Sequence, residues 1–131
     1  MKKVLFICVE NSARSQMAEA FANAYGKGEI VASSAGTMPC ERVNPLAVQV
    51  MREKGIDTSK NKPKAIDVKM IEGADAVITM GCGAEGFCPA PLLEKVVDWK
   101  IEDPKGKPIE EVRKIRDEIE RKVKALIREM S

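Results

Sequence analysis

Two hydrophobic periods alternate along the 131-residue chain. Continuous apolar runs of strand length predict buried parallel strands at residues 4–7, 30–32 and 76–80, and a fourth, short strand within residues 94–99. Apolar positions three and four apart predict helices that run from Ser15 to Gly26, from Asn44-Pro45 to Gly55, over about residues 67–72, and onward from about Pro108. Strands that alternate with helices pair in parallel through right-handed crossovers, and helices then cover both faces of the sheet. We therefore expect one α/β domain over residues 1–131, a three-layer α/β/α architecture with a four-stranded parallel sheet.

The loop after the first strand carries the clearest chemical pattern. It runs Cys8-Val9-Glu10-Asn11-Ser12-Ala13-Arg14-Ser15, which is a cysteine, five residues, an arginine and a serine. Backbone N–H groups of this loop can converge on one tetrahedral anion, the following helix adds its positive N-terminal end, and Arg14 offers a planar fork that binds two oxygens. The same field favours thiolate over thiol, so Cys8 is predicted to be a nucleophile at neutral pH. Ser12 and Ser15 are candidate donors to the sulfur, and Asn11 is a candidate for stiffening the loop. The alternative is a buried, inert cysteine beside a surface arginine.

The position of this loop agrees with its chemistry. In open parallel sheets, ligands bind beyond the carboxyl ends of the strands, and the Cys8 loop follows the first of those ends. The chain contains no histidine, which excludes a Cys–His pair and a Ser–His–Asp triad. Asp103, in the loop between the last strand and the last helix, is followed by Pro104, which restrains it to extended geometry, as a positioned acid would need. An ordinary Asp-Pro turn is the alternative there.

Two more cysteines, Cys82 and Cys88, flank a glycine-containing stretch that follows the third strand. Because that strand also ends at the carboxyl edge of the sheet, we expect both to lie near Cys8. Three interpretations are open: a structural disulfide, a zinc site, and a thiol–disulfide relay. A structural disulfide is uncommon in the cytosol, and the chain has neither Cys-x2-Cys spacing nor histidine for zinc, so the relay is favoured. Cys40, next to Pro39 in a loop, fits none of these roles.

Composition narrows the range of partners. A formal net charge of +2 and an aromatic content of 4% give no reason to expect binding to nucleic acid or to a membrane surface. No apolar stretch approaches the ~20 residues of a membrane span, and the N-terminal apolar run is too short for a signal peptide. The expected location is the cytoplasm.

The chain resembles the low-molecular-weight protein tyrosine phosphatases, and specifically their thioredoxin-coupled arsenate reductase branch. The similarity runs over nearly the whole chain, and its motifs are Cys8 to Ser15, Ser15-Gln16-Met17-Ala18-Glu19, Ser34-Ala35-Gly36, Val43-Asn44-Pro45, the Cys82/Cys88 pair, Asp103-Pro104 and Arg116-Asp117-Glu118-Ile119. Both branches share the Cys-x5-Arg-Ser loop and the Asp-Pro acid. Cys82 and Cys88 distinguish the reductases from the phosphatases. Lys105 does so as well, because phosphatases typically place tyrosines there that contact an aromatic substrate.

The resemblance implies a sequence of chemical steps. Arsenate, with phosphate or sulfate as analogues, docks in the Cys8–Arg14 loop, Cys8 attacks arsenic, and Asp103 protonates the departing oxygen. Cys82 then attacks Cys8, arsenite leaves, and Cys88 converts the Cys8–Cys82 disulfide into Cys82–Cys88, which thioredoxin reduces. No bound cofactor or metal is required. The alternatives are a low-molecular-weight phosphatase working through a Cys8 phosphoenzyme, and a redox-sensing or anion-binding regulator on the same fold.

Several positions depart from the pattern of the family. Glu10 stands where related loops usually have glycine. If this position needs a positive φ, a glutamate fits it poorly and the loop backbone must differ from that of its relatives. Ala13 replaces a residue that is often cysteine. Some reductases bind potassium beneath the loop, and Asn11, Glu19 and Ser34 match three of the ligand positions, whereas Lys64 falls where the aspartate belongs. We hypothesise that the Lys64 ammonium stands in for the ion.

Overall fold

The structure, a computed structural model, describes residues 1–81 and 96–130. Strands and helices alternate along the chain, as the two hydrophobic periods predict. In chain order the elements are β1 (Lys2–Cys8), α1 (Arg14–Tyr25), β2 (Ile30–Gly36), α2 (Pro45–Arg52), α3 (Val68–Gly73), β3 (Ala76–Thr79), β4 (Val96–Asp98) and α4 (Ile109–Met130). No helix among the described residues is both long enough and apolar enough to cross a membrane.

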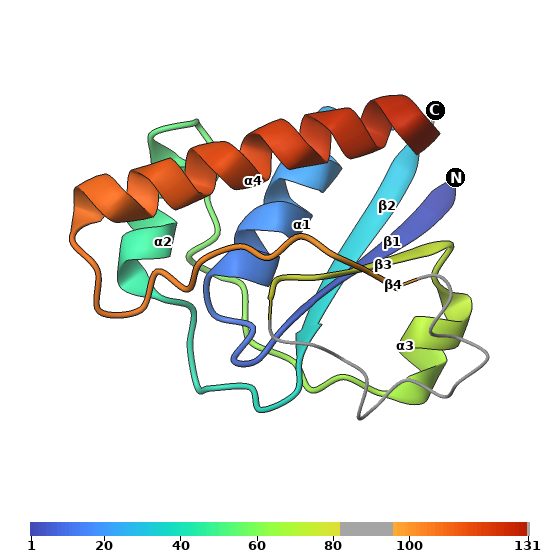
Figure 1. Ribbon diagram of the computed structural model, residues 1–131, viewed down its shortest axis with the longest axis horizontal. Helices are drawn as coiled ribbons and strands as arrows, with labels where there is room; N and C mark the ends of the chain where they lie inside the picture. Colours follow the sequence, from blue (N-terminus) through green and yellow to red (C-terminus); the bar gives the residue numbers. More distant parts are fainter. Residues whose placement is uncertain (82–95, 131) are drawn as a thin grey trace.

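The four strands form one parallel sheet in the order β2-β1-β3-β4 (Figure 1). β1 lies inside the sheet and pairs with β2 on one side, from Lys2 opposite Ile30 to Cys8 opposite Gly36, and with β3 on the other. The chain therefore leaves β1 toward one side of the sheet and later returns to its other side. Such a reversal leaves a crevice beyond the carboxyl end of the strand, and Cys8 is the last residue of that strand.

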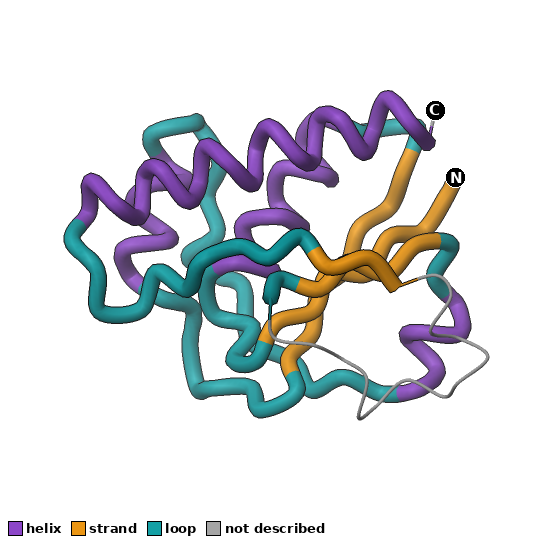
Figure 2. The backbone as a smooth tube through the Cα atoms, in the orientation of Figure 1, coloured by secondary structure: helices purple, strands orange, loops and turns teal. Residues whose placement is uncertain are grey.

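Helices cover both faces of the sheet, which confirms the predicted three-layer fold (Figure 2). Side chains of β1 alternate between the faces. Val4, Phe6 and Cys8 belong to a large buried cluster that includes residues of α1, α2 and α4. Leu5 and Ile7 belong to a smaller cluster with residues of α3 and β3. Both faces of β1 are thus buried, which is why its sequence is a continuous apolar run.

The second strand is longer than its apolar run predicts. The sequence ends this strand at residue 32, whereas β2 continues through two serines, Ala35 and Gly36. Gly36 donates its N–H to the Lys64 carbonyl at 2.7 Å and accepts from the Ile66 N–H at 3.0 Å. The end of β2 is therefore held on both sides, by pairing with β1 and by bonds to the segment before α3, which keeps its small and polar residues in the strand beside the site.

Candidate active site

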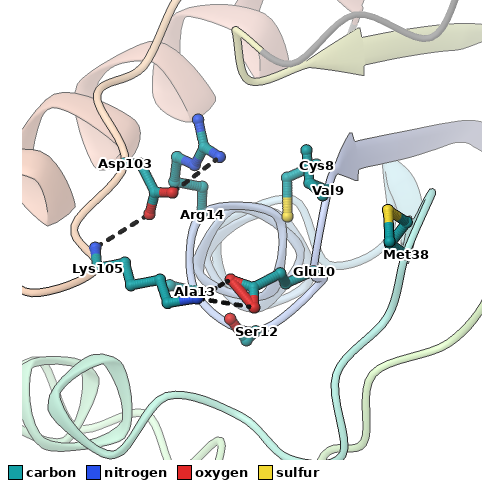
Figure 3. A pocket seen from close by; sticks show the side chains of 9 residues that line it. All are labelled: Cys8, Val9, Glu10, Ser12, Ala13, Arg14, Met38, Asp103 and Lys105. Carbon is teal, nitrogen blue, oxygen red and sulfur yellow. Dashed lines mark hydrogen bonds and ion pairs between the residues drawn. The ribbon is translucent and has the colours of Figure 1, made fainter.

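A cavity of about 390 Å³ opens beyond the carboxyl end of β1 (Figure 3). Its walls come from three parts of the chain that lie far apart in sequence: the β1–α1 loop, the segment after β2, and the loop between β4 and α4. The lining residues are Cys8, Val9, Glu10, Ser12, Ala13, Arg14, Met38, Asp103 and Lys105. The structure thus brings together the nucleophile, the arginine and the acid that the sequence predicts.

The sulfur of Cys8 is held by two hydrogen-bonding groups. The backbone N–H of Asn11 donates to Sγ at 3.2 Å, and the Ser15 Oγ lies 2.9 Å from Sγ. Asn11 Nδ2 also donates to the Ser15 Oγ at 2.7 Å, which leaves the serine hydrogen free to point at the sulfur. Donors aimed at the sulfur stabilise a thiolate more than a thiol. Cys8 is buried, with an exposed fraction of 3%.

Asn11 organises the loop around that sulfur. Its backbone has a φ of 52°, a left-handed conformation that asparagine tolerates better than most residues. Its Oδ1 accepts from the Lys64 backbone N–H at 2.9 Å and from Gln16 Nε2 at 3.2 Å. The side chain of Asn11, which is fully buried, therefore connects the anion loop to α1 and to the segment before α3.

Helix α1 begins at the cavity without a cap from a side chain. The residue at its N-cap is Ala13, whose methyl group cannot accept a hydrogen bond, and the first turn of the helix carries no acidic residue. The first N–H groups of a helix need acceptors from outside the helix, and anions bind well there. The alanine therefore leaves this helix end available to an oxyanion.

Arg14, the first residue of α1, is held in place by backbone carbonyls. Its Nη1 donates to the Met80 carbonyl at 2.5 Å and to the Ile101 carbonyl at 2.9 Å. Its Nη2 lies 3.8 Å from Oδ2 of Asp103, whose side chain is half-exposed at the rim of the cavity. Asp103 Oδ1 accepts from the Lys105 backbone N–H at 3.0 Å, which fixes the carboxyl group in a short turn. One nitrogen of the fork is thus fixed by the protein, and the other lies beside the candidate acid.

A second carboxylate fixes the strand ends behind Arg14. Asp98, the last residue of β4, accepts from the Gly81 N–H at 2.6 Å and from the Lys100 N–H at 3.1 Å. Burial opposes ionisation of this group, but the backbone N–H donors of Lys100 and Gly81 prevail, and the pKa of Asp98 lies below its usual value. A charged Asp98 therefore ties the end of β3 to the end of β4.

Glu10 takes part in the cavity through its side chain. Among the residues with described geometry, only Asn11 and Lys100 combine a side chain with a positive φ, so the backbone at position 10 does not require glycine. The Glu10 carboxylate lies 3.4 Å from the Lys105 ammonium across the cavity. Glu10 thus places a negative charge next to a positive one at the rim of the cavity.

The residues proposed to surround a cation occupy the base of the loop. Ser34 Oγ donates to Glu19 Oε1 at 2.5 Å, and Asn11 bonds to its own neighbours as described. Lys64 reaches Asn11 through its backbone N–H, and the residue is exposed to solvent. The replacement of an ion by the Lys64 ammonium stays a prediction. Within residues 1–81 and 96–130, no three His, Cys, Asp or Glu side chains are grouped as ligands of a metal ion.

Cys82 and Cys88 lie outside the described residues. Cys40 is half-buried, and its Sγ donates to the Arg42 carbonyl at 3.0 Å, while its backbone N–H donates to the Glu10 carbonyl at 3.2 Å. Sequence reasoning missed the place of Met38 in the cavity wall and the link that Gln16 makes with Asn11. An exposed methionine and a helical glutamine carry no pattern that would have marked them.

Comparisons with known proteins agree with this geometry. The profile of the low molecular weight phosphotyrosine protein phosphatase family matches residues 3–131. A Synechocystis protein named glutaredoxin arsenate reductase is 39% identical over 133 residues, covering 100% of both chains, and an arsenate reductase of Bacillus cereus is 37% identical over 124 residues, covering 94% of this chain and 92% of the relative.

The fold is similar to solved structures of arsenate reductases and of a low molecular weight phosphatase. An arsenate reductase in a phosphate-binding state has a TM-score of 0.88 at 38% identity and full coverage of both chains. A low molecular weight protein tyrosine phosphatase of T. tengcongensis has a TM-score of 0.90 at 30% identity, covering 98% of this chain and 99% of the other. A thioredoxin-dependent arsenate reductase of Corynebacterium glutamicum has a TM-score of 0.83 at 34% identity, covering 99% of this chain and 62% of the other.

Proposed function

Because the chain belongs to the low molecular weight phosphotyrosine protein phosphatase family, we propose that it uses the family's anion loop to reduce arsenate to arsenite. The observation that carries the proposal is the position of the Cys8 sulfur. It lies at the end of β1, in contact with the Ser15 hydroxyl and the Asn11 N–H, in a cavity that also holds Arg14 and Asp103. The arsenate reductases among its relatives support the choice of substrate.

The first step is substitution at arsenic. The arsenate dianion binds to the loop N–H groups, to the uncapped end of α1 and to the Arg14 guanidinium. The Cys8 thiolate attacks arsenic, a sulfur–arsenic bond forms, and one arsenic–oxygen bond breaks. Asp103 gives its proton to the departing oxygen, which leaves as water. No electrons have yet moved to the substrate.

The second step is the reduction. The Cys82 thiolate attacks the Cys8 sulfur, and the electron pair of the sulfur–arsenic bond stays with arsenic, which falls from the +5 to the +3 state. Arsenite leaves, and a Cys8–Cys82 disulfide remains. Cys88 then attacks Cys82, which frees Cys8 and produces a Cys82–Cys88 disulfide. Thioredoxin reduces that disulfide, so thiols supply both electrons and no bound cofactor enters the cycle.

The names of two relatives refer to different electron donors. The C. glutamicum structure is that of a thioredoxin-dependent enzyme, which supports thioredoxin here, whereas the Synechocystis relative is named for glutaredoxin. This chain covers the full length of the Synechocystis relative but 62% of the C. glutamicum protein. The test of function therefore supplies each donor system separately.

The test measures arsenate-dependent oxidation of NADPH, with thioredoxin and its reductase in one series and with glutathione, glutaredoxin and glutathione reductase in the other. Wild type is compared with the serine variants of Cys8, Cys82 and Cys88, and Cys40→Ser is the matched control. We expect no turnover with Cys8→Ser or Cys82→Ser, about one turnover with Cys88→Ser, and wild-type rates with Cys40→Ser. Several rapid turnovers by Cys88→Ser with thioredoxin alone would contradict the order of the relay.

Hydrolysis of phosphate esters is the second candidate. It is favoured by the similarity to the T. tengcongensis phosphatase, and Cys8, Arg14 and Asp103 suffice for it. Cys82→Ser separates the two functions, because the thiol is needed for reduction alone. In a reductase this variant loses arsenate turnover and keeps any cleavage of p-nitrophenyl phosphate. A wild type that cleaves the ester efficiently and leaves arsenate unreduced with both donor systems would be a hydrolase.

A further inference from the structure

Glu10 and Lys105 stand between two neighbouring hollows. The first is the anion cavity, and the second, of about 190 Å³, lies beside it and includes Arg42, Val43 and Pro45 in its wall. Glu10 and Lys105 line both hollows. Figure 3 shows the lysine side chain running along the cavity toward the glutamate, and the ammonium lies 3.4 Å from the nearer carboxylate oxygen. We call this ion pair the Glu10–Lys105 bridge.

We infer that the Glu10–Lys105 bridge sets the specificity of the site: it admits a free tetrahedral oxyanion and disfavours the esters of such an anion. The inference deepens the proposed function, because it concerns which ligand the anion cavity accepts. It gives a role to two charged side chains of the cavity wall that the proposed chemical steps do not use.

The position of Asp103 explains why the bridge acts on esters. The leaving oxygen of any substrate must face the acid that protonates it, and Asp103 lines both hollows together with Lys105. In free arsenate or phosphate that oxygen carries only a proton. In an ester it carries an alcohol group, and because Asp103 lines the second hollow as well as the first, we place that group between the two hollows. The bridge occupies that position, so an ester must displace it and a free anion need not.

Both ends of the bridge are fixed by the backbone. The Glu10 carbonyl accepts from the Cys40 N–H at 3.2 Å, and the Lys105 N–H donates to Asp103 Oδ1 at 3.0 Å. A variant that truncates either side chain therefore keeps the loop in place and keeps Asp103 in its turn. The side chain of Lys105 is 72% exposed and that of Glu10 is 32% exposed, so the bridge is a solvated ion pair. Pairs of this kind change an equilibrium by a few-fold, about fivefold at most.

The experiment separates the bridge from simple charge effects. For wild type, Glu10→Ala, Lys105→Ala and the double variant, kcat/KM is measured for p-nitrophenyl phosphate and Ki is measured for inorganic phosphate as a competitive inhibitor. Loss of a negative charge strengthens the binding of both anions, and loss of a positive charge weakens both. Because tighter binding raises kcat/KM for the ester and lowers Ki for phosphate, the product of the two cancels this shared charge effect. We expect this product to rise about three- to fivefold in each single variant and no further in the double variant, since either change opens the same bridge.

A matched control lies in the same loop. Lys107 pairs with Glu102 at 3.0 Å, and neither residue lines the cavity. Lys107→Ala should leave the product of kcat/KM and Ki unchanged. An unchanged product in both bridge variants, equal changes in the control, additive effects in the double variant, or no ester cleavage by any variant would each overturn the inference. Because the assay needs neither arsenate nor Cys82, failure of the bridge and failure of the reductase proposal give different results.

Discussion

Replacing Asn11 with alanine tests how the anion loop is built. The change removes three side-chain hydrogen bonds at once: the bond to Ser15 Oγ at 2.7 Å, and those from the Lys64 N–H at 2.9 Å and from Gln16 Nε2 at 3.2 Å. It also forces alanine into a backbone conformation with φ near 52°. Both effects act at a residue that is fully buried.

The size of the effect follows from these contacts. A buried donor or acceptor that loses its partner costs about 1–3 kcal/mol. The cost here is near the lower end of that range for each bond, because water can reach the exposed Lys64 residue, and because the buried Ser15 and Gln16 side chains keep their contacts with Cys8 Sγ and the Lys62 carbonyl. The three lost bonds therefore cost about 3 kcal/mol together. Alanine in the left-handed region adds about 1 kcal/mol. Asn11→Ala should therefore lower the free energy of unfolding by about 4 kcal/mol, a large part of the ~5–15 kcal/mol typical of a domain.

Equilibrium urea unfolding, followed by far-UV circular dichroism, measures this loss. Asn11→Gly is the matched control, since it loses the same side chain and adopts a positive φ freely. We expect the glycine variant to be about 1 kcal/mol more stable than the alanine variant. The rate of Cys8 alkylation by iodoacetamide should fall in both, because Ser15 loses the donor that directs its hydroxyl toward the sulfur.

Two results would refute this reasoning. If Asn11→Ala unfolds within about 1 kcal/mol of wild type, the side chain does not organise the loop. If the alanine variant equals or exceeds the glycine variant in stability, the backbone at this position is not left-handed.

The remaining predictions concern the loop, the guanidinium and the acid stability of the fold. In Gly36→Ala, the new Cβ would lie 2.6 Å from the Val9 carbonyl oxygen, which cannot yield, so we expect a loss of about 2 kcal/mol in urea unfolding and weaker phosphate binding by calorimetry. Arg14→Lys keeps the charge but loses the planar fork and its paired carbonyl contacts, and phosphate affinity should fall about tenfold or more in the same calorimetric assay. Hydrogen bonds from Arg113, and then from Arg116, lower the pKa of Glu53 from 4.5 to about 2. Since the folded pKa is the lower one, the stabilisation is present above pH 4.5 and is lost as the pH falls toward 2, so Glu53→Gln should flatten the decline of Tm across that range, and an unchanged decline would contradict the assignment.

The elements with a strong hydrophobic period were predictable from the sequence. The long helix α4 and the buried strands β1 and β3 follow from local patterns alone. The meeting of Cys8, Arg14 and Asp103 was predictable as well, because parallel strands place their carboxyl ends, and the loops that follow, at one edge of the sheet.

Contacts between distant residues could not be predicted in the same way. Arg14 is held by carbonyls that are 66 and 87 residues away in sequence, and no local pattern encodes those partners. The left-handed backbone of Asn11 depends on the fit of its side chain between α1 and the Lys64 segment. The Glu10–Lys105 bridge joins residues 95 apart, and each of the two reads as an ordinary surface charge when taken alone.

The alanine at the start of α1 links occupancy of the site to the stability of the whole domain. A helix whose N-cap side chain makes no hydrogen bond can take that bond from a bound oxyanion. A ligand at a hundred times its Kd raises the free energy of unfolding by about 2.7 kcal/mol. The melting temperature of this protein should then rise with the concentration of arsenate, phosphate or sulfate in the buffer. A thermal shift assay would rank these oxyanions by affinity without any turnover. In a phosphate-rich medium, bound phosphate would stabilise the folded state while it competes with arsenate for the same site.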